Sequence, residues 1–241
     1  MILATYCCSD LHGNYKIFKN IQKRLKPEDT MYFLGDAADR GPDGWKIIKE
    51  ILQDNRWIYL KGNHEDMLVK AANAYLIRDE RWEYESYALC CQNGGEKTLT
   101  DWSLDKWRKE WLRCIEKLPV HAFYNSPLGI IRLSHAGYTP YYFTDYDGQP
   151  IDVPQEWELL WDRKHFIDKW DNKLAPNDYV IHGHTPCAYV ADSINVDFDV
   201  RREDGPLWYC DNRKCCLDIG TAYTDQAVVL DLDTFEHCII D

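Results

Sequence analysis

Six short segments of the chain hold side chains that can bind metal ions and phosphate. Carboxylates, imidazoles and one carboxamide recur in them, and these are donors that borderline divalent metals accept in proteins. No candidate donor is a thiolate, which argues against a closed structural zinc site. The candidate metal ligands are Asp10, His12, Asp36, Asn63, His135 and His184.

The spacing of these donors predicts that they lie at the ends of strands. Asp10 and His12 stand two residues apart near the end of an apolar run, where strand alternation points both side chains to one side. Asp36, Asn63 and His135 also follow apolar runs that predict strands. Open α/β sheets place their sites at the carboxyl ends of strands, so we expect the donors to gather there.

The charge of such a site suits a phosphate ester. Two divalent cations bring about four positive charges, and Asp10 and Asp36 offset about two of them. Cations roughly 3.5–4 Å apart generate hydroxide near neutral pH and clamp the phosphoryl oxygens during in-line displacement. The residue types therefore predict a metal-dependent phosphoester hydrolase.

Four further residues fit the same reaction. Arg40 and Arg163 can hold phosphoryl oxygens in a bidentate fork. His64 follows the ligand Asn63 and is placed to protonate the leaving oxygen, while Asp39 can orient His64 and raise its pKa. His182 lies two residues before His184, and we expect it behind the site or in the core rather than on a metal.

Apolar periodicity predicts the elements that position these residues. Strands at 2–9, 31–34 and 57–60 alternate with helices at 15–26 and 43–54, which is typical of βαβ units. Residues 64–118 are predicted to be a helical, aromatic-rich insertion that packs its Trp107, Trp111 and Ile115 face on the domain, with a substrate platform as the alternative. Later strands are expected at 120–125, 129–134, 179–181, 216–219, 226–232 and 237–240, with a helix at 155–164 and an irregular loop at 138–155. No linker or repeat is visible, so we expect one α/β domain with two sheets over 1–241.

Composition narrows the class of protein. The net charge of −12 argues against a nucleic-acid surface, which needs basic patches. No apolar run approaches the roughly 20 residues that span a membrane, and the N-terminus lacks the basic region of a secretory signal, so we expect a cytoplasmic protein. The ten cysteines are then expected to be buried free thiols rather than disulfides or a zinc site.

The motifs resemble those of the calcineurin-like metallophosphoesterase superfamily, and its phosphoprotein phosphatase branch of the small bacterial and phage type. The resemblance runs from Asp10 to about Gly220. It implies two mixed β-sheets sandwiched between helices, and a metal-bridging hydroxide as the nucleophile. It further implies that the first metal is held by Asp10, His12 and Asp36, the second by Asp36, Asn63, His135 and His184, the phosphate by Arg40, Arg163 and Asn63, and the leaving group by His64 with Asp39.

Two details of the motifs bear on the substrate. Many nuclease and phosphodiesterase members end in Gly-His-x-His, whereas here Thr185 and Pro186 follow His184, which favours the protein-phosphatase-like branch. Symmetrical diadenosine tetraphosphatases of that branch usually lack the carboxylate that matches Asp39, so its presence favours phosphomonoesters. We therefore expect a Ser/Thr, or dual-specificity, protein phosphatase.

Two alternatives stay open. One is a hydrolase of dinucleoside polyphosphates or other small phosphoesters, and the other is a binding module that has lost catalysis, which the intact set of ligands and arginines opposes. Manganese is the expected metal, but Fe, Zn and Mg suit the same donors, because availability decides among them.

Overall fold

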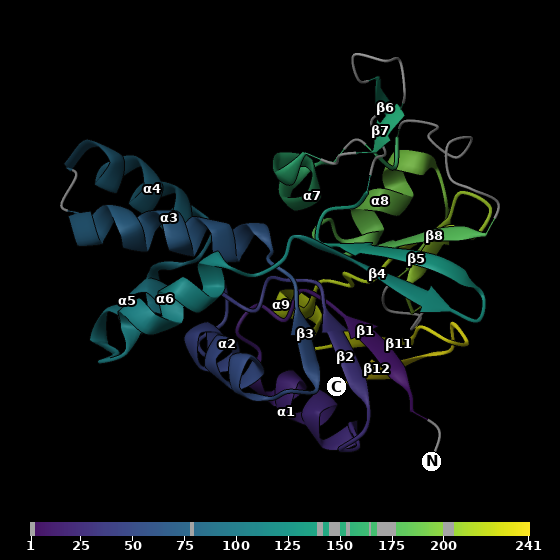
Figure 1. The fold of residues 1–241 in the computed structure, drawn as a ribbon, viewed down its shortest axis with the longest axis horizontal. Coiled ribbons are helices and arrows are strands. Elements are labelled where there is room, and N and C mark those ends of the chain that lie inside the picture. The colour runs from purple at the N-terminus through teal and green to yellow at the C-terminus, as the bar shows by residue number, and fades with distance from the viewer. Residues whose placement is uncertain are drawn as a thin grey trace.

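The computed structural model describes residues 3–77, 80–138, 142–144, 150–152, 155–163, 165–167, 177–199 and 205–241. Two five-stranded sheets lie face to face in it, and helices lie on their outer sides (Figure 1). The predicted α/β fold of two mixed sheets between helices is therefore confirmed. No helix in the described ranges is both long and apolar enough to cross a membrane.

The first sheet brings three loops to one edge. Its strand order is β12-β11-β1-β2-β3, with β1 (Thr5–Cys8), β2 (Thr30–Phe33), β3 (Trp57–Tyr59), β11 (Ala227–Asp231) and β12 (His237–Ile240). Strands β1, β2 and β3 are parallel, so each needs a crossover, and α1 (Tyr15–Arg24) and α2 (Gly44–Gln53) supply them. Cys8 pairs with Phe33 and Phe33 with Tyr59, so the three strands end level with one another.

The second sheet supplies two more loops. Its order is β4-β5-β8-β10-β9, with β4 (His121–Ser126), β5 (Gly129–Ser134), β8 (Asp178–His182), β9 (Leu207–Tyr209) and β10 (Lys214–Cys216). β5 and β8 are parallel and pair Leu133 with Ile181, so their carboxyl ends also coincide. The helix α8 (Cys187–Ile194) covers this sheet, and α9 (Thr221–Thr224) precedes β11 (Figure 1).

Alternation along the strands divides the core in two. Cys7 and Leu230 pack between the sheets, whereas their neighbours Cys8 and Val229 pack toward the helices of the first sheet. This period of two is what places an apolar side chain on each face of a central strand. The first sheet is therefore buried on both faces, which holds its loops in fixed positions.

The predicted helical insertion is confirmed. It consists of α3 (Asn63–Ile77), α4 (Glu80–Gln92), α5 (Glu96–Leu104) and α6 (Arg108–Glu116), and extends from one side of the molecule (Figure 1). Its expected apolar face is only partly buried, because Ile115 is inaccessible and Trp111 packs on the core while Trp107 is 54% exposed just before α6. The spacing thus predicted the helix α6 but not the exposure of Trp107.

Several expectations need correction. The strand expected at 216–219 is β10 at Lys214–Cys216, and the hydrogen bond from the N–H of Leu217 to the carbonyl of His182 lies at its end. Within the loop expected at 138–155, β6 (Tyr142–Thr144) pairs with β7 (Pro150–Asp152), and residues 139–141, 145–149, 153 and 154 lie outside the described residues. The helix expected at 155–164 is the shorter α7 (Glu156–Trp161), and α8 and β9 were not predicted.

The cysteines follow the prediction in most positions. All ten lie in the described part of the chain and all are free thiols. Six are buried, three are intermediate, and Cys114 is exposed on α6, contrary to the expectation of burial.

Candidate metal centre

Most candidate residues lie in loops that begin where the parallel strands end, whereas Asn63 and His64 start α3 and Arg163 follows α7. Six of them have a positive φ, which L-residues other than glycine rarely adopt and which costs of order 1–3 kcal/mol each in sparsely populated regions. Such conformations persist only where the surrounding structure determines them, and they cluster at functional sites. The residues and their φ values are Asp10 (55°), His12 (41°), Asp36 (62°), Asp39 (68°), Arg40 (61°) and His184 (67°).

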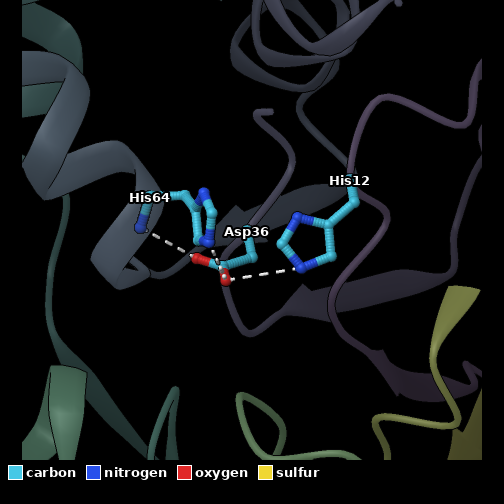
Figure 2. Close-up of side chains that lie close together, drawn as sticks. All are labelled: His12, Asp36 and His64. Atoms are coloured by element: carbon cyan, nitrogen blue, oxygen red, sulfur yellow. Dashed lines mark hydrogen bonds and ion pairs between the residues drawn. The ribbon is translucent and has the colours of Figure 1, made fainter. Parts of the chain in front are cut away.

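Asp36 is the centre of the cluster, as Figure 2 shows. Its Oδ2 lies 3.7 Å from Nε2 of His12 and 3.7 Å from Nε2 of His64, and its Oδ1 accepts a hydrogen bond from the His64 backbone N–H at 3.1 Å. Oδ1 also lies 3.4 Å from Nε2 of His135, which comes from the other sheet. One carboxylate therefore faces imidazoles that follow strands of both sheets.

A second group of donors surrounds Asn63. Its Oδ1 lies 2.8 Å from Nε2 of His135 and 2.9 Å from Nδ1 of His184. Donor atoms of Asp36, His135 and His184 lie within 4.8 Å of one another, and so do those of His12, Asp36 and His64. The structure thus brings the donors together in two groups that share Asp36.

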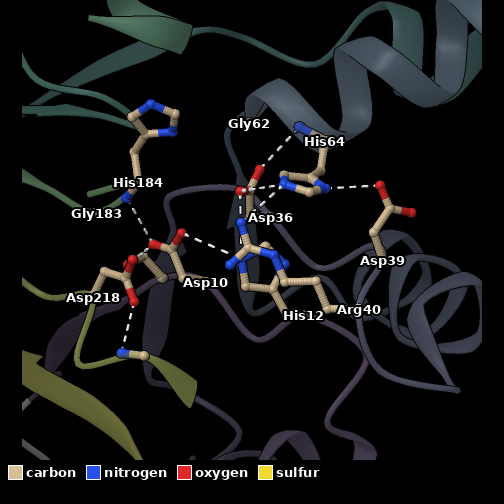
Figure 3. A network of polar contacts seen from close by, with 12 residues as sticks. Asp10, His12, Asp36, Asp39, Arg40, Gly62, His64, Gly183, His184 and Asp218 are labelled. Atoms are coloured by element: carbon tan, nitrogen blue, oxygen red, sulfur yellow. Dashed lines mark hydrogen bonds and ion pairs between the residues drawn. The ribbon is translucent and has the colours of Figure 1, made fainter. Parts of the chain in front are cut away.

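Asp10 connects the two sheets at this centre. Its Oδ2 accepts a hydrogen bond from the backbone N–H of His184 at 3.0 Å, and its Oδ1 lies 3.9 Å from Nε2 of His12 (Figure 3). Two glycines permit such close approach, since a Cβ at Gly183 would lie 2.0 Å from Oδ2 of Asp10, and one at Gly62 would lie 2.2 Å from Oδ1 of Asp36. A larger residue at either position would force these carboxylates to shift.

The donor set fits divalent cations. Oδ1 of Asp10 and Nε2 of His184 are buried without a hydrogen-bond partner among the described residues, and a buried polar atom without a partner is costly. Nδ1 of His12 donates to the carbonyl of Ala38 at 3.0 Å, which leaves its Nε2 lone pair directed at Asp36. Oδ1 of Asp10 and Nε2 of His12 are therefore atoms that a cation would bind, whereas His184 meets the other donors through its Nδ1, 3.1 Å from Nε2 of His135.

Without a bound cation, protonated histidine offsets the negative charge of the carboxylates at the centre. Burial lowers the pKa of His135, but the carboxylate of Asp36 outweighs that effect and raises this pKa to about 9. Burial opposes ionisation of Asp36, yet His135 and His64 hold its pKa well below the usual range. Burial is the main cause that lowers the pKa of His12 to about 3 and the pKa of His184 well below its usual range, and neighbouring positive charges add to both shifts. A cation bound here would take over the positive charge that His135 now supplies.

Glu65 organises the loop that carries Asp36, a role that the sequence did not reveal. Its Oε2 accepts the backbone N–H of Asp36 at 2.8 Å and that of Gly62 at 2.9 Å. Its Oε1 accepts the N–H groups of Ala37 at 2.9 Å and Ala38 at 3.3 Å. Burial and the charge of Asp36 raise the pKa of Glu65, and the N–H groups of Asp36 and Gly62 oppose that shift by stabilising the carboxylate. Its position directly after Asn63 and His64 was the only signal in the sequence.

His64 and Asp39 form the expected pair. Nδ1 of His64 lies 2.7 Å from Oδ2 of Asp39, and both side chains are buried. Burial lowers the pKa of His64, but Asp36 and Asp39 outweigh it, so this pKa is raised. The backbone N–H of Asp39 donates to Oγ1 of Thr98, which no sequence motif indicated. Arg40 approaches Nε2 of His64 with its Nη2 at 3.4 Å (Figure 3).

Comparison with known proteins decides the family. A family model described as calcineurin-like phosphoesterase matches residues 3–188. The chain belongs to the calcineurin-like phosphoesterase family. This phosphoesterase is therefore a metal-dependent phosphoester hydrolase of a family that uses two metal ions, as the motifs predicted.

Relatives of this phosphoesterase include two kinds of tetraphosphatase. It is 25% identical over 215 residues to the asymmetrical bis(5'-nucleosyl)-tetraphosphatase PrpE of Anoxybacillus flavithermus, which covers 78% of this chain and 82% of that protein. It is 30% identical over 143 residues to the symmetrical bis(5'-nucleosyl)-tetraphosphatase of Buchnera aphidicola, which covers 57% of this chain and only 46% of that relative. The similarity to PrpE is thus the more extensive of these two.

Solved structures confirm the fold of the phosphoesterase. A candidate diadenosine tetraphosphatase superposes with a TM-score of 0.60 at 16% identity, covering 98% of this chain and 92% of that one. A serine/threonine phosphatase of Saccharomyces cerevisiae with similarity to human PP5 superposes with a TM-score of 0.61 at 15% identity, covering 96% and 73%. At these identities the likeness shows a shared fold and does not distinguish the substrates.

Two residues considered in the sequence analysis, Arg163 and His182, lie at the edge of the metal centre. Arg163 is exposed after α7, and within the described residues its influence on the site is the charge that helps to lower the pKa of His184, after burial and His135. His182 is buried with Nε2 2.8 Å from the Tyr209 hydroxyl and Nδ1 3.0 Å from the carbonyl of Gly183. The phosphoesterase therefore places His182 in the core behind His184.

Proposed function

We propose that this phosphoesterase hydrolyses dinucleoside polyphosphates. The observation that carries the proposal is the similarity to the PrpE tetraphosphatase, which extends over 78% of the chain and 82% of that relative. Similarity to symmetrical tetraphosphatases supports the same substrate class over a shorter part of the chain. The sequence favoured a protein phosphatase, and the comparisons favour the alternative.

The roles of the site residues remain those that the sequence indicated, now as a proposal. Bound at this centre, two cations would supply an activated water and would offset the charge that develops on the phosphoryl group. The mixed oxygen and nitrogen donors accept Mn, Fe, Zn and Mg alike. We propose manganese for the assay. One cation would be held by Asp10, His12 and Asp36, and the other by Asp36, Asn63, His135 and His184.

The chain's own residues would bind the phosphate and move the proton. Asp39 accepts the hydrogen bond from Nδ1–H of His64 and, with Asp36, favours the imidazolium form, whose Nε2–H can donate its proton to the leaving oxygen. Arg40 lies 3.4 Å from that Nε2, where its guanidinium can pair with phosphoryl oxygens. Asn63 and the exposed Arg163 are proposed to contact the same phosphate from the other side.

Asp39 does not discriminate between substrate classes in this arrangement. We expected its carboxylate to indicate phosphomonoesters. Its contacts are with His64 and, through its backbone, with Thr98, so it positions an acid that either class of substrate can use. The acidic net charge of −12 disfavours long polyanions such as nucleic acids, and it leaves a short dinucleotide as a compatible substrate.

The test compares four substrates with the manganese-loaded protein. These are diadenosine tetraphosphate, a phosphothreonine peptide, p-nitrophenyl phosphate and bis-p-nitrophenyl phosphate, with Asp36→Asn as the inactive control. We expect the dinucleotide to give the highest kcat/KM and the control to lose that activity. The nucleotide products report the cleavage position, because symmetrical cleavage gives two ADP and asymmetrical cleavage gives ATP and AMP. Turnover of the peptide with an intact dinucleotide would refute the proposal and restore the protein phosphatase.

A further inference from the structure

A pocket of about 280 Å³ opens beside the metal centre, between α3 and α7. Both walls belong to elements that carry proposed site residues, because α3 begins with Asn63 and His64, and α7 leads directly to Arg163. The lining residues are Asp66, Lys70, Glu156, Trp157, Leu160 and Trp161. This α3–α7 pocket is thus a natural extension of the site.

Two tryptophans define the aromatic wall of the α3–α7 pocket. Trp157 and Trp161 are four residues apart on α7, so their side chains share one face of the helix. The ring of Trp161 lies 6.4 Å from that of His184, at an interplanar angle of 79°. Trp157 is 64% exposed at the same pocket. An indole surface therefore runs outward from a proposed metal ligand into solvent.

The charged residues of the pocket select against phosphate. Two carboxylates, Asp66 and Glu156, face one ammonium, Lys70, which is already paired with Asp66 at 2.7 Å. Glu156 also lies 3.8 Å from Nζ of Lys61. Carboxylates accept hydrogen bonds from hydroxyl and amine donors, which a ribose and a purine present, and they repel phosphate.

We infer that the α3–α7 pocket binds one nucleoside of the substrate, with its base stacked on Trp157 and its phosphates directed toward the metal centre. This inference rests on the proposed function. Ligand pockets commonly measure roughly 300–1,000 Å³, so one of about 280 Å³ suits a single nucleoside rather than a whole dinucleotide. Stacking on an indole tolerates different bases, so the pocket recognises a nucleoside as a class.

The test compares Trp157→Ala with a matched control, Trp107→Ala. Trp107 is similarly exposed, at 54% against 64%, and lies beside α6 rather than at this pocket. For each manganese-loaded protein we would measure kcat/KM for diadenosine tetraphosphate and for p-nitrophenyl phosphate, which carries no nucleoside. Removal of one stacking ring should lower the ratio of the two values by at least about fivefold, mainly through KM.

Rescue and failure are distinguishable. Trp157→Phe keeps an aromatic face and should restore most of the ratio, and Trp107→Ala should leave the ratio at the wild-type value. An unchanged ratio in Trp157→Ala, with the wild type cleaving the dinucleotide, would overturn the nucleoside pocket alone. A wild type that cleaves p-nitrophenyl phosphate and ignores the dinucleotide would overturn the proposed function and the pocket together.

Discussion

The carboxylate of Glu65 should stabilise the loop that carries Asp36 by several kcal/mol of unfolding free energy. In Glu65→Gln, one acceptor oxygen becomes an NH₂ group that faces two backbone N–H donors, either those of Asp36 and Gly62 or those of Ala37 and Ala38. Each donor that loses a charged acceptor in a buried site costs about 1.5 kcal/mol. We therefore expect the free energy of unfolding to fall by about 3 kcal/mol.

The measurement is urea unfolding in the presence of EDTA, so that metal binding does not compensate for the loss. Glu110→Gln, at an exposed position on α6, is the matched control and should change stability by less than about 0.5 kcal/mol. Calorimetric titration should also show weaker binding of manganese, because the loop that carries Asp36 loses its support. If Glu65→Gln matched the wild type in both stability and metal affinity, the four hydrogen bonds would not hold the loop.

Three further predictions concern the acid, a surface pair and the metal. His64→Ala should reduce turnover of phenyl phosphate far more than that of p-nitrophenyl phosphate, whose leaving group needs little protonation, and equal losses would exclude an acid role. Hydrogen bonds from Arg56 lower the pKa of Asp54 from 3.8 to about 2, which stabilises the fold above pH 4. Asp54→Asn should therefore cost about 1–2 kcal/mol at pH 7 in urea unfolding, and this difference should vanish as the pH falls from about 4 to about 2. Because Asp36 raises the pKa of His135 to about 9, metal binding below that pH should release a proton, visible as a buffer-dependent heat in calorimetry.

The sequence predicted those parts of the site that depend on a strand and the residue after it. Asp36 was identified because a carboxylate follows an apolar run, and level strand ends then bring it beside His12 and His64. The burial of His182 behind His184 was also predicted correctly. In these cases local alternation is enough to give the direction of the side chain.

Contacts between distant segments could not be predicted in this way. Glu65 accepts hydrogen bonds from residues 27 to 29 positions earlier, and Thr98 accepts one from Asp39, 59 positions away. These contacts depend on how the loops fold, including the positive φ at Asp36 and Asp39, for which no single sequence signal exists. The helix α8 was missed for a related reason, because its buried residues pack on a sheet that the sequence did not place beside it.

The metal centre also lies between the two sheets, so metal binding affects how long the chain stays folded. Asp10 reaches His184 across 174 positions of the chain, and His135 donates to the carbonyl of Leu34 across 101 positions. Separation of the sheets would therefore break the proposed coordination of the second cation, whose ligands Asp36 and Asn63 come from one sheet and His135 and His184 from the other. A free cation concentration of about 100 times the dissociation constant adds about 2.7 kcal/mol to the stability of the folded state. A cell that withdraws metal from this enzyme would thus shorten its survival against proteolysis as well as stop its turnover.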